Sequence, residues 1–353
     1  LVDMYAKCMM LPKAKQVLEE LLVRNVVSWN ALITGYTQKG QGHEALNCFD
    51  QMQREGISPN TITFICILKA CGSIGAIEKG RDIHFDVERE GLIGTDIVIG
   101  NALVYMYARF GLFSQAQTVF DKLPLRNVVT WTTLISGYIE YGYALEVLVC
   151  FELMQYEGIY PNIITYMCSL KACGCIRAIE EGKILHNEIL RRGLLEEDVV
   201  IGRAMVSMYA KMGMISVAQL VFDKLQWKDV ISWTALIEGC SEHGYAQEAL
   251  ELYGKMRLHG VNPNAVTFLS LLKACGSIRA IEKGVIVHAD MHNRGLVGNN
   301  VMLDTGLVDM YAKCGAFAKA EEMFHLLHFR NLFGWSILMA GYIQQGQGEN
   351  ALN

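Results

Sequence analysis

The sequence predicts an all-α protein, a right-handed superhelical solenoid of stacked helix-turn-helix units. Three observations support this fold class. Segments recur at a fixed step of 102 residues, apolar residues follow the 3.6-residue period of amphipathic helices, and no stretch shows the alternation typical of strands. A hairpin of two amphipathic helices cannot bury its apolar face alone, so neighbouring hairpins must stack and leave a long concave surface.

Three independent markers share the step of 102 residues. The segment "LVDMYAKC" at 1–8 returns as "LVYMYARF" at 103–110, "MVSMYAKM" at 205–212 and "LVDMYAKC" at 307–314. The segment "KACGSI" at 69–74 returns as "KACGCI" at 171–176 and "KACGSI" at 273–278, and one tryptophan recurs as Trp29, Trp131, Trp233 and Trp335. The chain is therefore a repeat array rather than a set of unrelated domains.

The stretch 26–60 shows how one unit is built. Apolar residues at i, i+3, i+4 and i+7 predict its first helix, namely Trp29, Leu32, Ile33 and Tyr36. We expect Ser28 to cap the start of this helix and Gly40 to end it. A second helix is predicted from Ala45, Leu46, Phe49 and Met52, and Gly56 and Pro59 close it. The unit is a helix-turn-helix hairpin of 35 residues.

The same scheme divides the rest of the chain. Units of 35, 36 and 31 residues together fill each period of 102. We expect a partial unit at 1–25 and another at 332–353. The nine complete units between them, 26–331, form three triplets: 26–60, 61–96, 97–127, 128–162, 163–198, 199–229, 230–264, 265–300 and 301–331.

Composition limits the function classes. The net charge is −5 with a pI near 6.0, so the chain lacks the bulk positive charge of proteins that coat nucleic acid, and any such site must be local. The eleven cysteines are not densely spaced, which predicts buried free thiols in a reducing compartment. We see neither a signal nor a transit peptide at the start of the chain, and no apolar run long enough to span a membrane.

Several stretches point to one family. The segment "VVSWNALITGYTQKGQGHEALNCFDQMQREGISPN" at 26–60 resembles a pentatricopeptide repeat. The lengths of 35, 36 and 31 residues resemble the P, L and S motifs of the plant PLS subclass, as do "TFICILKACGSIGAIEKGRDIH" at 63–84 and "GNALVYMYARFGLFSQAQTVFDKLPLRN" at 100–127. Tetratricopeptide repeats are the nearest confusable class, but they lack this alternation of lengths.

The resemblance implies sequence-specific binding of single-stranded RNA, with one nucleotide per repeat, in a mitochondrion or chloroplast. It also implies a non-enzymatic role as the specificity part of a C-to-U editing factor. The chemistry would come from a C-terminal deaminase-like extension, which the stretch before Asn353 does not show, or from a partner protein. We expect no cofactor, metal, DNA or membrane partner. The alternative function is a scaffold for protein–protein interaction.

In this family the fifth and last residues of a unit choose the base. The P-like units place there Asn30 with Asn60, Thr132 with Asn162, and Thr234 with Asn264. The S-like units place there Asn101 with Asn127, Arg203 with Asp229, and Thr305 with Asn331. By this resemblance, an Asn–Asn pair implies a pyrimidine and a Thr–Asn pair implies adenine.

Hydrogen-bond chemistry agrees with these preferences. An Asn amide can donate to the ring acceptor of adenine or cytosine, whereas an ionised Asp can only accept, which suits guanine or uracil. The L-like units carry Ile65, Met167 and Leu269 at the fifth position and should be degenerate. Arg203 departs from the family pattern, and contact with phosphate, obstruction of a base and exposure to solvent all stay open.

The resulting pattern, with the chain read from its N-terminus along RNA 5′ to 3′, covers nine nucleotides. The units from 26 to 331 imply pyrimidine, any, pyrimidine, adenine, any, unassigned, adenine, any and adenine.

Two further sets of residues are candidates for RNA contacts. The second residue of a unit resembles the family position that packs between bases, although a helix-entry hydrophobe is an equally good interpretation; these are Val27, Val98, Val129, Val200 and Ile231. Recurrent basic residues are candidates for phosphate contact, although a cation there also complements the helix dipole; these are Lys69, Arg109, Lys171, Lys211, Lys273 and Lys313.

His186 and Glu188 form a His-x-Glu pair, which nucleobase deaminases use for zinc binding and proton transfer. However, His84 and His288 occupy the same position one period away, and no two cysteines have the C-x-x-C spacing that the metal site needs. We therefore expect a structural repeat histidine. The cysteines at 71, 173 and 275 recur with the same period and are expected to pack in the core.

Overall fold

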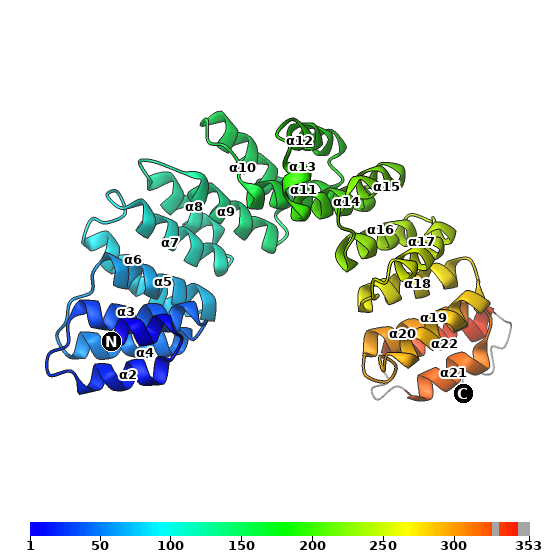
Figure 1. Ribbon diagram of the computed structural model, residues 1–353, viewed down its shortest axis with the longest axis horizontal. Coiled ribbons are helices and arrows are strands. Elements are labelled where there is room, and N and C mark those ends of the chain that lie inside the picture. Colours follow the sequence, from blue (N-terminus) through cyan, green and yellow to red (C-terminus); the bar gives the residue numbers. More distant parts are fainter. Residues whose placement is uncertain (327–331, 345–353) are drawn as a thin grey trace. The chain divides into compact units, whose positions relative to one another are not determined.

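The computed structural model describes residues 1–326 and 332–344, and it is helical throughout this part of the chain, without a strand (Figure 1). The prediction of an all-α fold is therefore confirmed. The helices divide into two compact bodies, residues 1–172 and 173–353, which we describe separately. Among the described residues, no helix combines the length and the apolar character that crossing a membrane requires.

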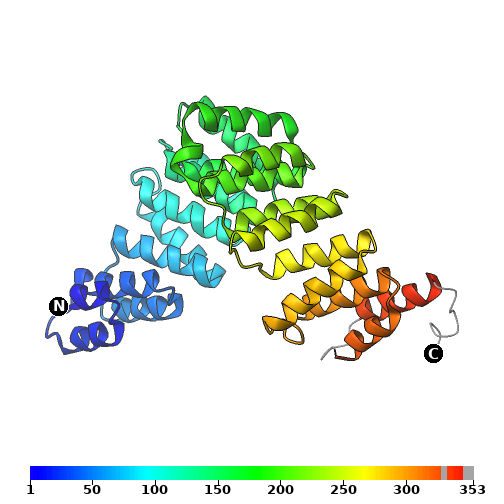
Figure 2. The same ribbon diagram turned by 45° about the vertical axis from the view of Figure 1, so that its right-hand side comes forward.

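The first body consists of antiparallel helix pairs that follow one another along the chain (Figure 2). Its helices are α1 (Val2–Lys7), α2 (Leu11–Glu20), α3 (Val26–Gln38), α4 (Gly42–Arg54), α5 (Thr61–Ile74), α6 (Ile77–Arg89), α7 (Ile97–Arg109), α8 (Phe113–Lys122), α9 (Val128–Glu140), α10 (Ala144–Tyr156) and the greater part of α11 (Ile163–Ile176). The first helices of successive units pack on one another in the order α1, α3, α5, α7 and α9. One continuous layer of first helices results.

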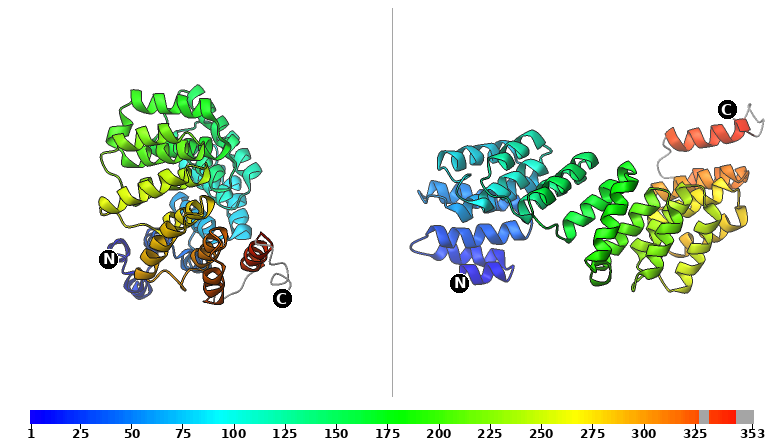
Figure 3. Two further views of the ribbon diagram at one scale, coloured as in Figure 1. Left: turned by 90° about the vertical axis from the view of Figure 1, so that its right-hand side faces the viewer. Right: turned by 90° about the horizontal axis from the view of Figure 1, so that it is seen from above.

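The second body repeats this arrangement (Figure 3). Its helices are α12 (Ile179–Arg191), α13 (Leu194–Glu197), α14 (Val199–Lys211), α15 (Ile215–Lys224), α16 (Val230–Glu242), α17 (Ala246–Leu258), α18 (Ala265–Ser277), α19 (Ile281–Asn293), α20 (Val301–Lys313), α21 (Phe317–Leu326) and α22 (Leu332–Gln344). Here α14, α16, α18, α20 and α22 form the layer of first helices. The short helix α13 was not predicted, and it packs on α12 and α14.

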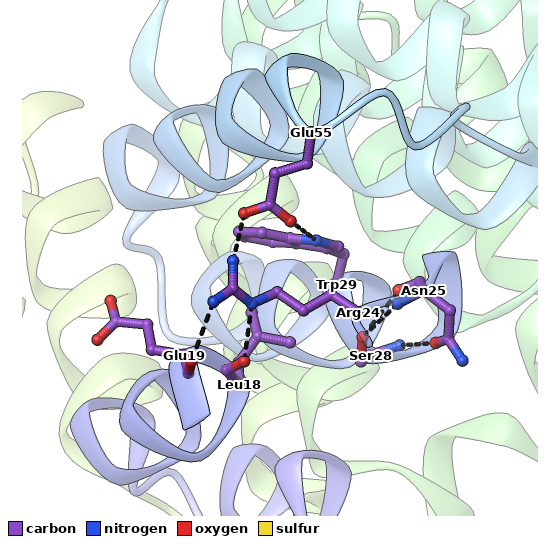
Figure 4. Close-up of polar contacts among 7 residues, drawn as sticks. All are labelled: Leu18, Glu19, Arg24, Asn25, Ser28, Trp29 and Glu55. Atoms are coloured by element: carbon purple, nitrogen blue, oxygen red, sulfur yellow. Dashed lines mark hydrogen bonds and ion pairs between the residues drawn. The ribbon is translucent and has the colours of Figure 1, made fainter. Parts of the chain in front are cut away.

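The start of α3 corrects one detail of the sequence analysis. The N-cap is Asn25, whose Oδ1 accepts the backbone N–H of Ser28 at 2.9 Å, while the Ser28 hydroxyl accepts the backbone N–H of Asn25 at 3.1 Å. Ser28 is thus the third helical residue of a capping box (Figure 4). At the other end, Gly40 has a φ of +73°, as a glycine that follows a helix C-cap commonly does.

The tryptophan that marks the repeat is held in an ion-paired bridge between units. Arg24 donates to the carbonyl oxygens of Leu18 at 3.0 Å and Glu19 at 2.9 Å, and it forms an ion pair with Glu55 (Figure 4). The other Glu55 oxygen accepts the indole N–H of the buried Trp29 at 3.3 Å. The end of α2, the start of α3 and the end of α4 are therefore tied together.

The bridge recurs one period later and then changes. Arg126, Glu157 and Trp131 repeat it, and the indole N–H donates to Glu157 at 3.1 Å. In the second body, Lys228 and His259 replace the arginine and the glutamate. The indole Nε1 of Trp233 is buried and has no hydrogen-bond partner there. This third bridge lacks its charged acceptor.

Candidate nucleic-acid interface

The last residue of a unit is the N-cap of the next unit's first helix. Asn60, Asn162 and Asn264 each use Oδ1 to accept the backbone N–H of a threonine three residues later, at 3.1, 2.9 and 2.9 Å. Because the cap consumes the amide oxygen, it fixes the orientation of the amide and leaves the Nδ2 group free to donate. Asn127 caps α9 in the same way.

The fifth residue of a P-like unit lies beside that cap and is buried. The Asn30 amide donates to Asn60 Oδ1 at 2.8 Å and accepts the Thr63 hydroxyl at 2.6 Å. In the next P-like unit, the Thr132 hydroxyl meets the Thr165 hydroxyl at 3.0 Å. Thr165 in turn donates to Asn162 at 2.9 Å, so fifth and last residues are linked across the boundary between units.

The third P-like unit repeats this link in the second body. The hydroxyls of Thr234 and Thr267 lie 2.7 Å apart, and Thr267 donates to Asn264 at 3.0 Å. The bridging threonines were missed by the sequence analysis. Their signal was available, because a threonine recurs at the third position of every L-like unit, as Thr63, Thr165 and Thr267.

Three grooves collect the predicted residues at junctions between first helices. Each groove is lined by the fifth and second residues of a unit together with a basic residue of a neighbouring unit. Their volumes are about 270, 560 and 300 Å³ in chain order. Their lining includes, respectively, Lys7, Val27, Asn30, Asn60 and Ile62; Arg109, Val129, Thr132, Asn162 and Ile164; and Leu269, Lys273, Met302 and Thr305.

The second residues of the units are solvent-exposed in spite of their apolar character. Val27 is 70% exposed, Val129 53% and Ile231 54%. Val98 is also exposed, and Val200 is half-buried. A helix-entry hydrophobe that served the core would be buried, so core packing does not account for the exposed members of this set.

The basic candidates are all exposed on first helices, and they differ in their partners. Arg109, Lys211 and Lys313 are the last residues of their helices, and the other three lie further inside theirs. Arg109 forms an ion pair with Glu140, which lies on the next first helix. Lys313 pairs with Asp309 at 2.7 Å on its own helix. The other four form no ion pair within the described part of the chain: Lys69, Lys171, Lys211 and Lys273.

The His-x-Glu motif is part of the repeat scaffold. His186 Nδ1 lies 2.8 Å from the Tyr209 hydroxyl, and His84 and His288 contact Tyr107 and Tyr311 in the same way. Burial lowers the pKa of His186 below its ordinary value of 6.5. Within the described residues, no group of three or more His, Cys, Asp or Glu side chains could hold a metal ion.

The periodic cysteines are fully buried, as predicted for packing residues. Cys71, Cys173 and Cys275 have no exposed surface. Burial raises the pKa of the Cys71 thiol to about 11 and those of Cys173 and Cys275 to about 12. These thiols are therefore neutral at physiological pH and unsuited to metal binding or nucleophilic chemistry.

Models of known protein families match the chain in segments that recur at the same step of 102 residues. The model of the PPR repeat family matches residues 24–73, 126–175 and 228–277, and the PPR repeat model matches 203–230 and 305–332. The chain belongs to the pentatricopeptide repeat family. The match covers segments in all three triplets, including the helices that carry the Asn and Thr residues described above.

Curated pentatricopeptide repeat proteins align over nearly the whole chain. Two chloroplastic proteins of Arabidopsis thaliana are 35% and 33% identical over 352 residues, which is 100% of this chain and 57% and 43% of theirs. A mitochondrial Arabidopsis thaliana protein is 33% identical and covers 98% of this chain and 50% of its own length. The chain thus spans about half the length of the relatives it matches.

Solved pentatricopeptide repeat structures share the fold. The crystal structure of PPR10 in complex with an 18-nt psaJ RNA element has a TM-score of 0.82 at 16% identity, covering 99% of this chain and 53% of that one. The structure of PPR10 from maize has a TM-score of 0.55 at 19% identity, covering 99% of this chain and 61% of that one. The predicted solenoid of helix-turn-helix repeats is confirmed.

Two S-like repeats depart from the linked arrangement. Arg203 does not face solvent freely, because its guanidinium pairs with Asp229 Oδ2 at 2.9 Å. Asp229 Oδ1 caps α16 by accepting the backbone N–H of Ser232, so both Asp229 oxygens are engaged. In the preceding S-like repeat, Asn101 Oδ1 is buried without a hydrogen-bond partner.

The other predicted base-reading positions are the pair Thr305 and Asn331 and the fifth residues of the L-like repeats. Thr305 is buried and its hydroxyl donates to the carbonyl oxygen of Val301 at 2.6 Å. Its expected partner Asn331 lies outside the described residues. In the L-like repeats the fifth residues are half-buried apolar side chains without hydrogen-bonding groups: Ile65, Met167 and Leu269.

Proposed function

We propose that this chain binds single-stranded RNA in a sequence-specific manner, with about one nucleotide per repeat. The observation that carries the proposal is the recurring junction, in which a capping Asn leaves Nδ2 to donate beside a buried fifth residue and an exposed apolar second residue. Such a junction offers an oriented donor for a base edge and an apolar surface for a base face.

The fixed amide supports the proposed base preferences. An outward Nδ2 can donate to the ring N1 of adenine or N3 of cytosine, whereas guanine and uracil carry N–H donors at these positions. Thr132 and Thr234 are smaller than Asn30, which leaves more room for a purine. The nine repeats from 26 to 331 would then read pyrimidine, any, pyrimidine, adenine, any, any, adenine, any and adenine, with the sixth unread because Arg203 occupies Asp229.

The proposal for the cellular role of the protein rests on its membership of the pentatricopeptide repeat family. The names of the relatives place them in chloroplasts and mitochondria, and the lengths of 35, 36 and 31 residues resemble the PLS subclass. We infer an organellar RNA-binding scaffold without catalytic activity of its own, the specificity part of a C-to-U editing factor. Catalysis would come from a deaminase-like domain or a partner protein.

A direct test is fluorescence anisotropy with the RNA 5′-CUCAUUAUA-3′ at one fixed salt concentration. Each of the three adenines is changed separately to guanine. We expect each change to weaken binding about tenfold, equivalent to ~1.4 kcal/mol. The Thr234→Asn variant should shift preference at the seventh nucleotide toward a pyrimidine and leave the others unchanged. Equal affinity for all four RNAs would refute base reading by these residues.

A further inference from the structure

Helix α10 exposes an apolar face that no other described element covers. Leu145 is 64% exposed, Val149 49%, Leu153 48% and Tyr156 90%. These four residues, the α10 stripe, lie at i, i+4, i+8 and i+11. At 100° per residue they fall within about 80° of one another on the helix surface. The stripe is therefore one continuous face.

The corresponding helices of the other P-like repeats show that the fold does not require this face to be apolar. At the four equivalent positions, α4 carries His43, Asn47, Gln51 and Arg54, and α17 carries Gln247, Glu251, Lys255 and Leu258. The buried face is apolar in all three helices, with Met52, Met154 and Met256 fully buried at one shared position. Only in α10 has the outer face also become apolar, so core packing does not explain the stripe.

The stripe is separate from the proposed RNA groove. The groove of this repeat is lined by residues of α7, α9, Asn162 and the start of α11, and none of its lining comes from α10. A ligand on α10 can therefore bind at the same time as RNA. A contiguous exposed apolar face on a protein of this kind marks an interaction surface.

The charged residues beside the stripe indicate what kind of partner can bind there. Glu152 and Glu146 flank the stripe, each about 20° outside one of its edges at 100° per residue. Both are exposed, and neither forms an ion pair among the described residues. Helix α10 contains no Lys or Arg. A second copy of α10 would place carboxylates against carboxylates, and an anionic membrane would be repelled. A partner with apolar residues flanked by basic ones complements both features.

We propose that the α10 stripe is the docking site for an amphipathic helix of another protein, with basic residues beside its apolar face. The stripe spans the 12 residues from Leu145 to Tyr156, whose 11 steps of 1.5 Å give about 16 Å of helix. Three turns of a partner helix with apolar anchors at i, i+4, i+7 and i+11 match this length. Glu146 and Glu152 pair with its lysines or arginines and fix its orientation.

The test uses two designed, fluorescein-labelled helical peptides that carry leucine at those four anchors. In one peptide the flanking positions are lysine, and in the other they are glutamate. Anisotropy is measured with the full chain and with the variant Leu145→His, Val149→Asn, Leu153→Gln and Tyr156→Arg. This variant copies α4, where the same residues are tolerated in the equivalent helix, so circular dichroism should show unchanged helix content.

We expect the lysine peptide to bind the native chain at least tenfold more tightly than it binds the variant, and more tightly than the glutamate peptide binds. Replacing both carboxylates, Glu146→Lys with Glu152→Lys, should reverse the preference between the peptides, and RNA bound in advance should not compete. Equal binding of both peptides, or equal binding to native chain and variant, would overturn the proposal. Self-association of the native chain that the variant abolishes would also overturn it, by showing that a second copy is the occupant.

Discussion

The most informative residues of this solenoid perform two tasks with one side chain. Asn264 caps α18 through Oδ1 and leaves Nδ2 to donate, so under the proposed function the need to cap the helix determines which atom would meet a base. Asp caps a helix about as well as Asn does, and its second oxygen can only accept. The Asn and Asp forms of this position should therefore differ in base preference and hardly at all in stability.

We predict that Asn264→Asp changes the preference at the seventh nucleotide from adenine to guanine, whose ring N–H can donate to the new oxygen. The free energy of unfolding should change by less than about 0.5 kcal/mol because the cap is kept. Asn264→Ala is the control, and it should lose both discrimination and about 1 kcal/mol of stability. Anisotropy and urea unfolding measure the two effects. An Asn264→Asp variant that still prefers adenine would contradict this account.

Arg203 offers a second test at the residue scale. Its ion pair with Asp229 uses the acceptor that, under the proposed function, would otherwise meet a base. Arg203→Thr removes the guanidinium, and we predict that the sixth nucleotide changes from unread to guanine-selective. Arg203→Lys keeps a cation beside Asp229 and should stay indifferent. The measurement is anisotropy with four RNAs that differ only at the sixth position, and indifference in the Thr variant would show that the ion pair is not what silences this repeat.

At the scale of the element, the bridge from the end of an S-like repeat to the following tryptophan varies among the triplets. Trp233 has a buried indole N–H without a partner because His259 stands where Glu55 and Glu157 accept the indole in the first two triplets. A buried unsatisfied donor costs about 1–3 kcal/mol. The second body therefore carries a local defect that the first body shows how to repair.

We predict that His259→Glu raises the free energy of unfolding by about 1 kcal/mol, and that adding Lys228→Arg raises it further by restoring the charged pair. The reciprocal change Glu157→His should destabilise the first body by a similar amount. Urea unfolding followed by circular dichroism gives both values. If His259→Glu leaves stability unchanged or lowers it, the bridge is not a stabilising element.

Sequence periodicity was sufficient to predict the helices, but it did not predict all of their N-caps or the ion pairs that join residues far apart in the chain. The 3.6-residue pattern correctly predicts that Trp29 is buried. It does not tell whether Asn25 or Ser28 is the N-cap, because a capping box has a polar residue at both of these positions. The Arg24–Glu55 ion pair joins residues 31 positions apart, and nothing local signals it. The Arg203–Asp229 pair shows the same limit at the site, because its two residues were identified separately and their contact depends on the packed geometry.

Three half-buried histidines make the stability of the protein depend on pH. His84, His186 and His288 each lie against a tyrosine, and burial lowers the pKa of each below 6.5. As pH falls below 6.5 the unfolded chain takes up these protons first, so the folded state loses stability until the lowered folded pKa values are passed. Stability should therefore be fully present above pH 6.5 and decline below it.

We predict that the midpoint of thermal unfolding falls between about pH 7.5 and 5.5, and that His186→Gln reduces this fall. His43→Gln, at an exposed histidine on α4, is the matched control for the loss of one histidine. Circular dichroism melting curves at fixed ionic strength are sufficient. An identical pH dependence in the native chain and the His186 variant would remove this histidine from the account.

At the scale of the whole molecule, the net charge limits how the chain can bind RNA. A chain of net charge −5 can bind an anion only through local cations, and two of the six candidates are already held by carboxylates, Arg109 by Glu140 and Lys313 by Asp309. Each phosphate contact on a single strand contributes about −0.7 to the slope of log K against log salt. Four free lysines therefore imply a slope of about −3, and all six cations would imply about −4.

We predict that Glu140→Gln releases Arg109 and steepens this slope by about 0.7 while raising affinity. Glu152→Gln changes the net charge equally but lies on α10, away from the groove, and should leave the slope unchanged. Anisotropy from about 50 to 200 mM salt separates the two variants. If both steepen the slope alike, the whole-chain field governs binding. If only Glu140→Gln does, the phosphate path runs past Arg109, and the Arg109–Glu140 pair restrains the affinity of this solenoid for RNA.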